Sequence, residues 1–427
     1  MVVELAIDTL TVGGRGLGRH GGKAVFVPLT APGDRVRCRV VRRHRHYDEA
    51  ELLELLEPAS QRRTPPCPVF GRCGGCQWQH LPYPQQVAWK YQLFAETLLR
   101  AGVVDATALR PLVSAPDEFG YRNRMQFKCR FAADGPVAGF YRHGSHYVID
   151  TPACLLAAPA IARTFTFLRE HLSQAPHPEA IPQLDVSCGD NGRVGVICHI
   201  LPDAVAASRV WLAETAARGG FSAALQSGRK DTLEIIHGDP ALTCTVDDPE
   251  LSLRISAGGF SQVNPRQNRA LVAAVLAAAD LSGAERVLDL YCGAGNFSLP
   301  LARRAGELIG VEEYAPAIAD ARANADRLGL GNARFLAEPA EGALSRLSGA
   351  FDLILLDPPR TGAYDIVRDL PAAAPRRILY VSCDPATLAR DLKPLVHNGY
   401  RVVSSQPFDL FPQTWHIESL TVLERSA

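Results

Sequence analysis

"VLDLYCGAGNF", residues 287–297, reads as an apolar strand, an acidic residue and a glycine-rich turn that opens a helix. Glycines in such a turn let the backbone approach a ligand at the carboxyl end of the strand. The next strand ends at Glu312, 23 residues after Asp289, where a carboxylate can accept both hydroxyls of a ribose. Because the pattern is D-x-x-x-G-x-G rather than G-x-G-x-x-G, it favours adenosyl-methionine as the ligand. A dinucleotide or a purely structural turn remains an alternative.

Apolar strands and helical segments alternate on both sides of this turn. The strand-like runs are "RVLDLY", "LIGVEE", "ARFLAE", "FDLILLD" and "RILYVSC". Such alternation is typical of a parallel, doubly wound sheet. We therefore expect residues 256–427 to form a Rossmann-like domain.

The first part of the chain has a different pattern. Short strands and glycine turns in residues 1–58 predict a small, OB-like β-barrel. Three arginines fall on one face of one strand, where they either contact RNA phosphates or form an ordinary solvated face: Arg35, Arg37 and Arg39. Residues 59–255 read as a central α+β domain, whose helix at 84–101 we expect to pack on the C-terminal domain. The fold class is thus multidomain α/β.

Composition and charge place few limits on the partner. The 427 residues include 45 basic and 45 acidic ones, and this balance neither favours nor excludes nucleic acid. The opening "MVVELAIDTL" lacks the basic start and apolar core of a signal peptide. No run of about 18 apolar residues predicts a membrane span. We expect a cytoplasmic protein with no membrane partner.

Three cysteines lie close together in "CPVFGRCGGC", residues 67–76, at the spacing C-x5-C-x2-C. A chain without signs of secretion is expected to keep its thiols reduced, so this group indicates metal ligands: Cys67, Cys73 and Cys76. A fourth ligand is needed. Four thiolates suit either zinc or an iron–sulfur cluster, and the spacing does not separate the two.

Two further strand ends carry candidate chemistry. "LLDPPR" places Asp357 at the end of one strand, and "RILYVSCDPATLARDL" places Cys383 at the end of the next. Asp384 and Thr387 are expected to cap the following helix, and a thiol near a helix N-terminus is favoured as the thiolate. An inert cysteine is the alternative. Arg360 follows the two prolines where amino-group methyltransferases often carry an aromatic residue, which argues against exocyclic amines as the target.

Glu418 lies in the strand-like run "FDLFPQTWHIESLTVL" and is either an edge residue or a general base tuned by burial. Methylation of uracil at C5 needs a thiolate that adds to C6, a methyl donor, and a base that removes the C5 proton. The C-terminal half offers all three.

Taken together, these motifs resemble the RNA uracil-C5 methyltransferase family. The motifs that carry the resemblance are "GGFSQVN" (258–264), "LDLYCGAGNFSL", "LLDPPRTGA", "YVSCDPATLARDL" and "FPQTWHIESL". The resemblance implies that Cys383 is the nucleophile and Glu418 the general base. It also implies a set of residues that bind S-adenosyl-L-methionine: Gln262, Tyr291, Asn296, Glu312 and Asp357. The family often has a polar residue near the adenine where this chain has Pro339, so a backbone group or Glu338 would have to replace that contact.

The resemblance extends to the front of the chain. "GRGLGR" and "GKAVFVPLTAPGDRVRCRV" look like a TRAM domain, an RNA-binding β-barrel. "PPCPVFGRCGGCQWQHLPYPQQVAWK" looks like the iron–sulfur segment of the ribosomal RNA branch of the family. The resemblance implies a [4Fe-4S] cluster, with zinc as the alternative, held by four ligands: Cys67, Cys73, Cys76 and Cys154.

A chain with both segments resembles the branch that methylates uridine 1939 of 23S ribosomal RNA, so we expect 23S rRNA as the partner of a monomeric enzyme. Alternatives are another uridine in rRNA or tRNA, a cytosine-C5 enzyme, or a non-catalytic RNA-binding protein with iron–sulfur or zinc.

Overall fold

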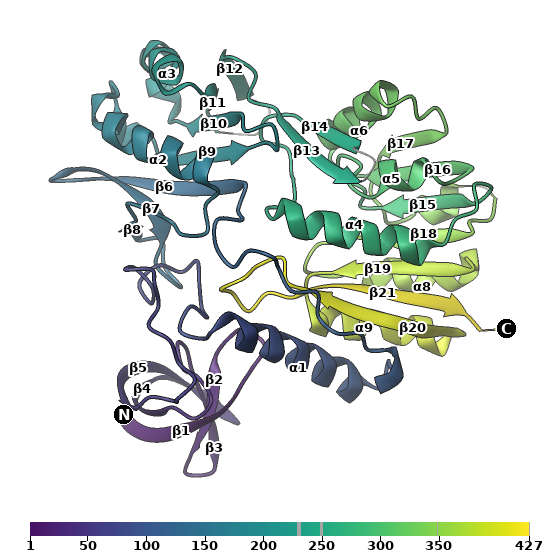
Figure 1. Cartoon of the computed structure of the whole chain (residues 1–427), viewed down its shortest axis with the longest axis horizontal. Coiled ribbons are helices and arrows are strands. Elements are labelled where there is room, and N and C mark those ends of the chain that lie inside the picture. The colour runs from purple at the N-terminus through teal and green to yellow at the C-terminus, as the bar shows by residue number, and fades with distance from the viewer. Residues whose placement is uncertain (229–231, 248–250, 348, 427) are drawn as a thin grey trace.

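The computed structural model describes residues 1–228, 232–247, 251–347 and 349–426. The chain begins with a closed five-stranded barrel in the order β1-β2-β3-β5-β4, as the sequence predicts (Figure 1). Its strands are β1 (Val2–Leu10), β2 (Gly16–His20), β3 (Lys23–Val27), β4 (Arg35–Arg43) and β5 (Tyr47–Glu57). Alternate residues of β1 and β4, among them Val3, Leu5 and Val36, fill the barrel because side chains of a strand point to opposite faces in turn.

The arginines of β4 lie on the outer face of the barrel, where each is paired with a glutamate. Arg35 bonds Glu57 at 3.0 Å and Arg39 bonds Glu51 at 2.7 Å. Arg37 contacts Glu4 and a second glutamate, Glu54. The three arginines share one face of the strand, as the sequence predicts, and each is paired because β1 and β5 place acids opposite them. Exposed pairs of this kind stabilise a protein by at most about 1 kcal/mol each.

The central region contains a seven-stranded sheet in the order β12-β11-β10-β9-β6-β7-β8. Its strands are β6 (Arg124–Ala132), β7 (Gly135–Tyr141), β8 (Val148–Asp150), β9 (Gln183–Cys188), β10 (Val194–His199), β11 (Ser222–Gln226) and β12 (Leu233–His237). Helices α2 (Pro159–His171) and α3 (Val205–Gly219) pack on one face of this sheet and share a buried core with it (Figure 1). The other face of β6 and β9 is polar.

The C-terminal region is a doubly wound sheet in the order β17-β16-β15-β18-β19-β21-β20. Its strands are β15 (Arg286–Leu290), β16 (Glu307–Glu312), β17 (Ala333–Ala337), β18 (Leu353–Leu356), β19 (Arg377–Ser382), β20 (Tyr400–Phe408) and β21 (Glu418–Arg425). Strands β15 to β19 run parallel and are almost wholly apolar, because helices bury both of their faces. The helices are α4 (Pro265–Ala279), α5 (Ser298–Ala302), α6 (Ala315–Arg327), α7 (Ala343–Arg346), α8 (Tyr364–Ala373) and α9 (Pro385–His397).

A two-stranded hairpin, β13 (Leu242–Asp247) and β14 (Leu251–Ile255), precedes this sheet in the chain. Its residues Leu251 and Leu253 belong to the same buried cluster as Leu271 of α4. The hairpin therefore packs with the C-terminal core, although it lies before residue 256. The division into 1–58, 59–255 and 256–427 stays a prediction.

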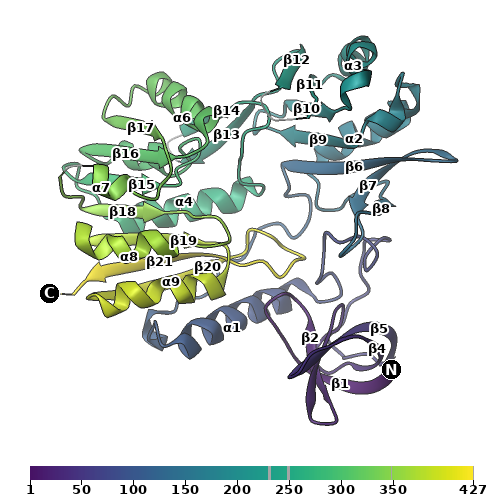
Figure 2. The ribbon, with the colours of Figure 1, turned by 180° about the vertical axis from the view of Figure 1, so that it is seen from behind.

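Helix α1 (Tyr83–Ala101) packs on the C-terminal region beside α9 (Figure 2). A proline starts it, and Gly102 ends it with a left-handed φ of 68°. On its buried side, Lys90 Nζ donates to Asp409 Oδ1 at 2.6 Å, and both side chains are 0% exposed. Among the described residues, no helix is long and apolar enough to cross a membrane.

The segment after Cys76 and the loop between β20 and β21 are joined by hydrogen bonds. The backbone N–H groups of Gln77 and Trp78 both donate to the carbonyl of Gln413 at 3.0 Å. Trp78 Nε1 also donates to the carbonyl of Gly14 in the barrel at 3.0 Å. A Cβ on Gly14 would stand 3.0 Å from the Trp415 side chain, so barrel and loop are in close contact.

Candidate active site

Four predicted site residues lie at the carboxyl ends of neighbouring parallel strands. Tyr291 follows β15, Glu312 ends β16, Asp357 follows β18 and Cys383 follows β19. The register pairs Leu290 with both Val311 and Leu356, so these ends lie level at one edge of the sheet. That edge is where open α/β sheets bind their ligands.

A cavity of about 740 Å³ opens at this edge. All seven residues predicted for catalysis and donor binding line it: Gln262, Tyr291, Asn296, Glu312, Asp357, Cys383 and Glu418. The structure thus brings together side chains from distant parts of the sequence, and each of them can contact a molecule bound in the cavity.

The glycine-rich turn forms one wall of the cavity. Tyr291 has a φ of 65°, a left-handed conformation that costs a non-glycine residue about 1–3 kcal/mol and concentrates at ligand sites. Gly293 and Gly295 continue the turn with φ of 54° and 95°. Behind it, Asp289 accepts a hydrogen bond from Ser298 Oγ at 2.5 Å, and burial raises the pKa of this carboxyl to about 8.

Glu312 and Asn296 face the cavity from either side of this turn. The Glu312 carboxylate accepts the backbone N–H of Tyr314 at 2.8 Å, which fixes its position at the end of β16. Asn296 exchanges two amide hydrogen bonds with Asn268 of α4, at 2.8 and 3.0 Å. Both side chains are therefore held in place before any ligand binds.

The glutamates that follow β17 differ in their position relative to the cavity. Glu338 forms an ion pair with Arg346 at 3.0 Å and does not line the cavity. Glu341, three residues further along, does line it and accepts a hydrogen bond from the Tyr291 hydroxyl at 3.1 Å. Glu338 is therefore not in position to supply the polar group near the adenine that Pro339 does not offer.

The antiparallel pairing of β19 with β21 brings Cys383 and Glu418 together. The last paired residues are Ser382 and Ser419, and Cys383 and Glu418 are the next positions along the two strands. Ser419 Oγ also donates to the carbonyl of Ser382 at 3.2 Å. Residues that lie opposite each other in such a pair have Cα atoms about 4.5–5.5 Å apart. The thiol and the carboxyl thus share one corner of the cavity.

The ionisation of this corner is set by burial. Burial raises the pKa of the Cys383 thiol to about 12, the neighbouring Glu418 adds to the rise, and Arg360 opposes it. Glu418 is only 4% exposed, and burial raises the pKa of its carboxyl well above the usual range, with Asp357 adding to the effect. Burial also raises the pKa of Asp357 to about 7. The expected preference for a thiolate is therefore wrong for the protein without ligands.

The helix N-terminus does not offset this burial. Asp384 caps α9 as predicted, and its Oδ1 accepts the N–H groups of Ala386 and Thr387, both at 2.9 Å. The cap carboxylate thus occupies the positive end of the helix, and Asp384 itself raises the pKa of Cys383.

Several cavity residues were not singled out from the sequence as functional. Arg360 contacts both ring nitrogens of His416 at 3.3 Å, and its charge lowers the pKa of Cys383 and of Glu418. Burial lowers the pKa of His416 to about 3, so its ring is neutral at physiological pH. Asn123 and Phe411 reach the same cavity from the central domain and from the β20–β21 loop. The sequence offered signals for some of them: Arg360 follows Asp-Pro-Pro, His416 lies two residues before Glu418, and Asn123 lies in the basic stretch 121–130.

The four predicted metal ligands line a second, smaller cavity of about 90 Å³: Cys67, Cys73, Cys76 and Cys154. Burial raises the pKa of Cys76 to about 12 and that of Cys154 to about 11. The Arg122 side chain also lines this cavity, and its buried Nε has no hydrogen-bond partner in the described part of the chain. Within those residues, no group of three or more His, Cys, Asp or Glu stands in position to hold a metal ion.

Comparisons with known proteins agree with this architecture. A family model described as tRNA (Uracil-5-)-methyltransferase matches residues 227–426, and a TRAM domain model matches residues 1–53. The chain is 38% identical over 434 residues to a protein of Alkalilimnicola ehrlichii named 23S rRNA (uracil(1939)-C(5))-methyltransferase RlmD, covering 99% of this chain and 97% of that protein. It is 36% identical over 444 residues to an uncharacterised RNA methyltransferase of Thermosynechococcus vestitus, covering 99% of this chain and 98% of that one.

A solved structure covers all regions of the chain. The tRNA (uracil-54, C5)-methyltransferase of Pyrococcus abyssi, in complex with S-adenosyl-L-homocysteine, superposes with a TM-score of 0.75 at 25% identity, and the match covers 99% of this chain and 100% of that one. With relatives above 30% identity along nearly its whole length, the chain belongs to the RNA (uracil-C5)-methyltransferase family.

Proposed function

We propose that the protein methylates C5 of a uridine in 23S ribosomal RNA, of the uridine 1939 type, with S-adenosyl-L-methionine as donor. The observation that supports the proposal is that Cys383 and Glu418 directly follow the last β19–β21 pair, Ser382 and Ser419, and line the same cavity as Glu312 and Asp357. The name of the relative from Alkalilimnicola ehrlichii supports the choice of RNA.

The walls of the cavity suit the donor. Glu312, held by the Tyr314 N–H, is placed to accept the ribose hydroxyls, and Asn296 and Gln262 offer amides beside it. Asp357 also lines the cavity, and we assign it to the reacting end of the donor, where its carboxylate would balance a cation. When bound, adenosyl-methionine supplies a methyl group carried by a positively charged sulfur. That charge lowers the pKa of nearby carboxyl groups and of the thiol.

Cys383 and Glu418 have different roles in the reaction at the uracil ring: Cys383 is the nucleophile and Glu418 is the general base. The Cys383 thiolate bonds to C6, and the electron pair of the C5–C6 double bond moves toward O4. C5 then bonds to the methyl group as the bond between that methyl group and the donor sulfur breaks, and the sulfur keeps the electron pair and loses its positive charge. The Glu418 carboxylate removes the proton from C5, the double bond returns, and the C6–S bond breaks to release the thiolate. A raised pKa makes ionised Glu418 a stronger base, and Arg360 favours the ionised form of both groups.

The four cysteines fit an iron–sulfur cluster better than a zinc ion. Zinc bonds sulfur at about 2.3 Å, which requires four sulfurs nearly in contact. Here the sulfurs border a cavity of about 90 Å³ instead. The guanidinium of Arg122 with its unpartnered Nε suits a cluster that carries negative charge. We therefore propose a [4Fe-4S] cluster held by the four cysteines, with a structural role.

All seven residues predicted for catalysis and donor binding line one cavity, so the proposed reaction requires no residue from a second chain, and we propose a monomeric enzyme. Ribosomal RNA as substrate supports a cytoplasmic location.

The test is methyl transfer to 23S rRNA made by transcription, with mass spectrometry to locate the methyl group. Cys383→Ala should abolish turnover while donor binding persists, and Cys244→Ala, a second cysteine of the same cavity, should retain turnover. A methyl group on cytosine, or undiminished turnover by Cys383→Ala, would contradict the proposal.

A further inference from the structure

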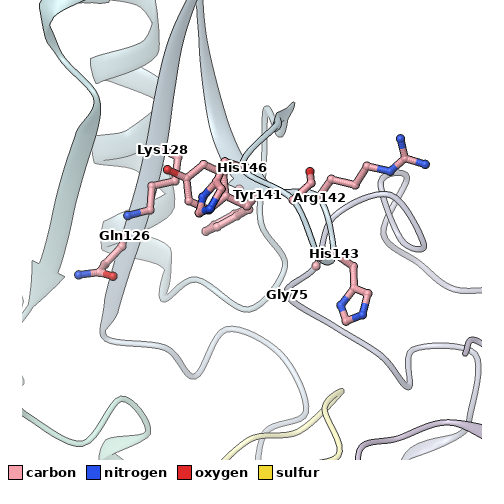
Figure 3. A pocket seen from close by; sticks show the side chains of 11 residues that line it. Gly75, Gln126, Lys128, Tyr141, Arg142, His143 and His146 are labelled. Carbon is pink, nitrogen blue, oxygen red and sulfur yellow. The ribbon is translucent and has the colours of Figure 1, made fainter. Parts of the chain in front are cut away.

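A third cavity lies on the central domain, away from the catalytic corner (Figure 3). It has a volume of about 520 Å³ and lies between β6, the turn that joins β7 to β8, and the glycines of the cysteine segment. We call it the hairpin pocket. Its principal side chains are Gln126, Lys128, Tyr141, Arg142, His143 and His146.

The walls of the hairpin pocket are aromatic and cationic. Lys128 Nζ stands 5.5 Å from the centre of the Tyr141 ring, and His146 meets that ring edge-on at 5.3 Å. Tyr141 is still 38% exposed, so part of its ring is free for another planar group. Arg142 and His143 extend from the turn at the outer rim (Figure 3). An exposed ring beside cations is how proteins hold an unpaired nucleotide, with the base stacked and the phosphate near the charge.

No acidic side chain lines this pocket among the described residues. Two acids lie on the same sheet face, and both have partners. Asp185 accepts hydrogen bonds from Gln126 and Gln183 and faces His199 at 3.4 Å, and Asp150 forms an ion pair with Arg169 at 2.6 Å. In the described part of the chain the Arg142 side chain has no hydrogen-bond or ion-pair partner. Unlike the arginines of β4, this cation is therefore available to a phosphate.

Strand β6 connects the hairpin pocket to the catalytic cavity. Asn123, just before β6, lines the catalytic cavity, and Arg124 donates to the carbonyl of Gly259 at 2.6 Å. From there Arg124, Gln126 and Lys128 follow one another on the polar face, because alternate residues of a strand share a face. Five residues of strand span about 16 Å. A short single-stranded segment can therefore reach from one cavity to the other.

The cysteine segment forms the floor of the hairpin pocket. The backbone N–H of Gly74 donates to the carbonyl of Tyr141 at 2.9 Å. A Cβ on Gly74 would stand 3.1 Å from backbone atoms of Tyr141 and His143, so a larger residue there would require the turn to move by a few tenths of an ångström. The turn that presents Tyr141 and Arg142 is thus supported by residues between the predicted metal ligands.

We propose that the hairpin pocket binds an unpaired nucleotide of the substrate RNA that flanks the target uridine. Its base packs on Tyr141 beside Lys128, and Arg142 contacts an adjoining phosphate. This inference rests on the proposed function, since it assumes that the target uridine occupies the catalytic cavity.

The test measures binding of a 23S rRNA stem-loop that contains the target, and of two shortened RNAs that lack the unpaired nucleotides on its 5′ or its 3′ side. Tyr141→Ala should raise the Kd for the full stem-loop about tenfold or more. Arg142→Ala should lower the slope of log K against log salt by about 0.7. Tyr141→Phe, which keeps the ring, and Arg218→Ala, an exposed arginine on α3, should bind as the unchanged protein does.

On one shortened RNA, the unchanged protein and Tyr141→Ala should bind equally, because the nucleotide that fills the pocket is gone. Equal Kd values on the full stem-loop, or the same loss on all three RNAs, would overturn the proposal. Donor binding by each variant should stay unchanged and serves as the check on folding. If the unchanged protein binds the stem-loop but transfers no methyl group to it, the proposed function is wrong. The Kd values of the variants on the three RNAs still show whether the hairpin pocket binds a nucleotide.

Discussion

Replacing Lys90 by methionine should destabilise the protein far more than removal of an ion pair on its surface. Lys90 and Asp409 are both 0% exposed and 2.6 Å apart, and burial lowers the pKa of Lys90. Asp409 Oδ1 also accepts the backbone N–H of Phe411 at 3.2 Å, and Asp409 Oδ2 has no hydrogen-bond partner among the described residues. Methionine keeps the length of the side chain but leaves the carboxylate buried without its cation. Loss of one partner of a buried pair costs about 3–5 kcal/mol.

The measurement is the free energy of unfolding in urea. For Lys90 it is taken from the transition that includes α1 and the C-terminal domain, and for Arg209 from the transition that includes the central domain. Arg209→Met is the matched control, because Arg209 and Glu234 are 2.9 Å apart but 47% and 45% exposed. It should cost less than about 1 kcal/mol. The double variant Lys90→Met/Asp409→Asn should recover most of the loss, since it removes the buried charge as well.

Two results would refute this reasoning. One is a loss for Lys90→Met as small as that for Arg209→Met, which would mean that water or another group compensates Asp409. The other is a double variant as unstable as Lys90→Met, which would assign the loss to packing of the lysine stem rather than to charge.

Three further predictions concern the chemistry. Glu418→Gln should accumulate a covalent protein–RNA adduct on denaturing gels, because the C5 proton is not removed and the C6–S bond persists; release of product at the normal rate would exclude Glu418 as the base. In the protein without ligands, the rate at which iodoacetamide alkylates Cys383 should rise about tenfold per pH unit up to pH ~10, because a thiol with a pKa of about 12 ionises only as the pH rises. The rate is measured by mass spectrometry of the peptide that contains Cys383. A rate that stops rising near pH ~8 would contradict the conclusion that burial raises the pKa of this thiol. Anaerobically purified protein should absorb broadly near ~400 nm with bound iron, and Cys154→Ser should lose both; a colourless, zinc-loaded protein would exclude the cluster.

Much of the site could be predicted because its residues lie at strand ends. Each parallel strand is a short apolar run whose end is visible in the sequence, and parallel strands finish at one edge of a sheet. Glu312, Asp357 and Cys383 were therefore expected together. The family resemblance added Tyr291, and the cavity contains all four. The barrel and the doubly wound sheet follow from the change of hydrophobic period between the two ends of the chain.

What could not be predicted depends on contacts between distant segments. Lys90 looks like any exposed lysine of a helix until Asp409 is placed opposite it. The face of Arg37 follows from alternation, but its partner Glu4 follows only from the register of β1 with β4. The ionisation of Cys383 depends on how deeply Glu418 and its neighbours bury it, and neighbouring sequence does not specify that depth.

The contact of the barrel with Trp78 and Trp415 has a consequence for which RNAs the enzyme accepts. Gly14 of the barrel is in close contact with the loop that leads to Glu418. This contact fixes the distance between the barrel and the catalytic corner. If the barrel and the catalytic corner both contact the RNA, the fixed distance between them selects RNAs whose two contacted features are that far apart. We expect the enzyme to choose its uridine by how far it lies from a second feature of the folded RNA, so that lengthening the intervening stem should move methylation to another position or abolish it.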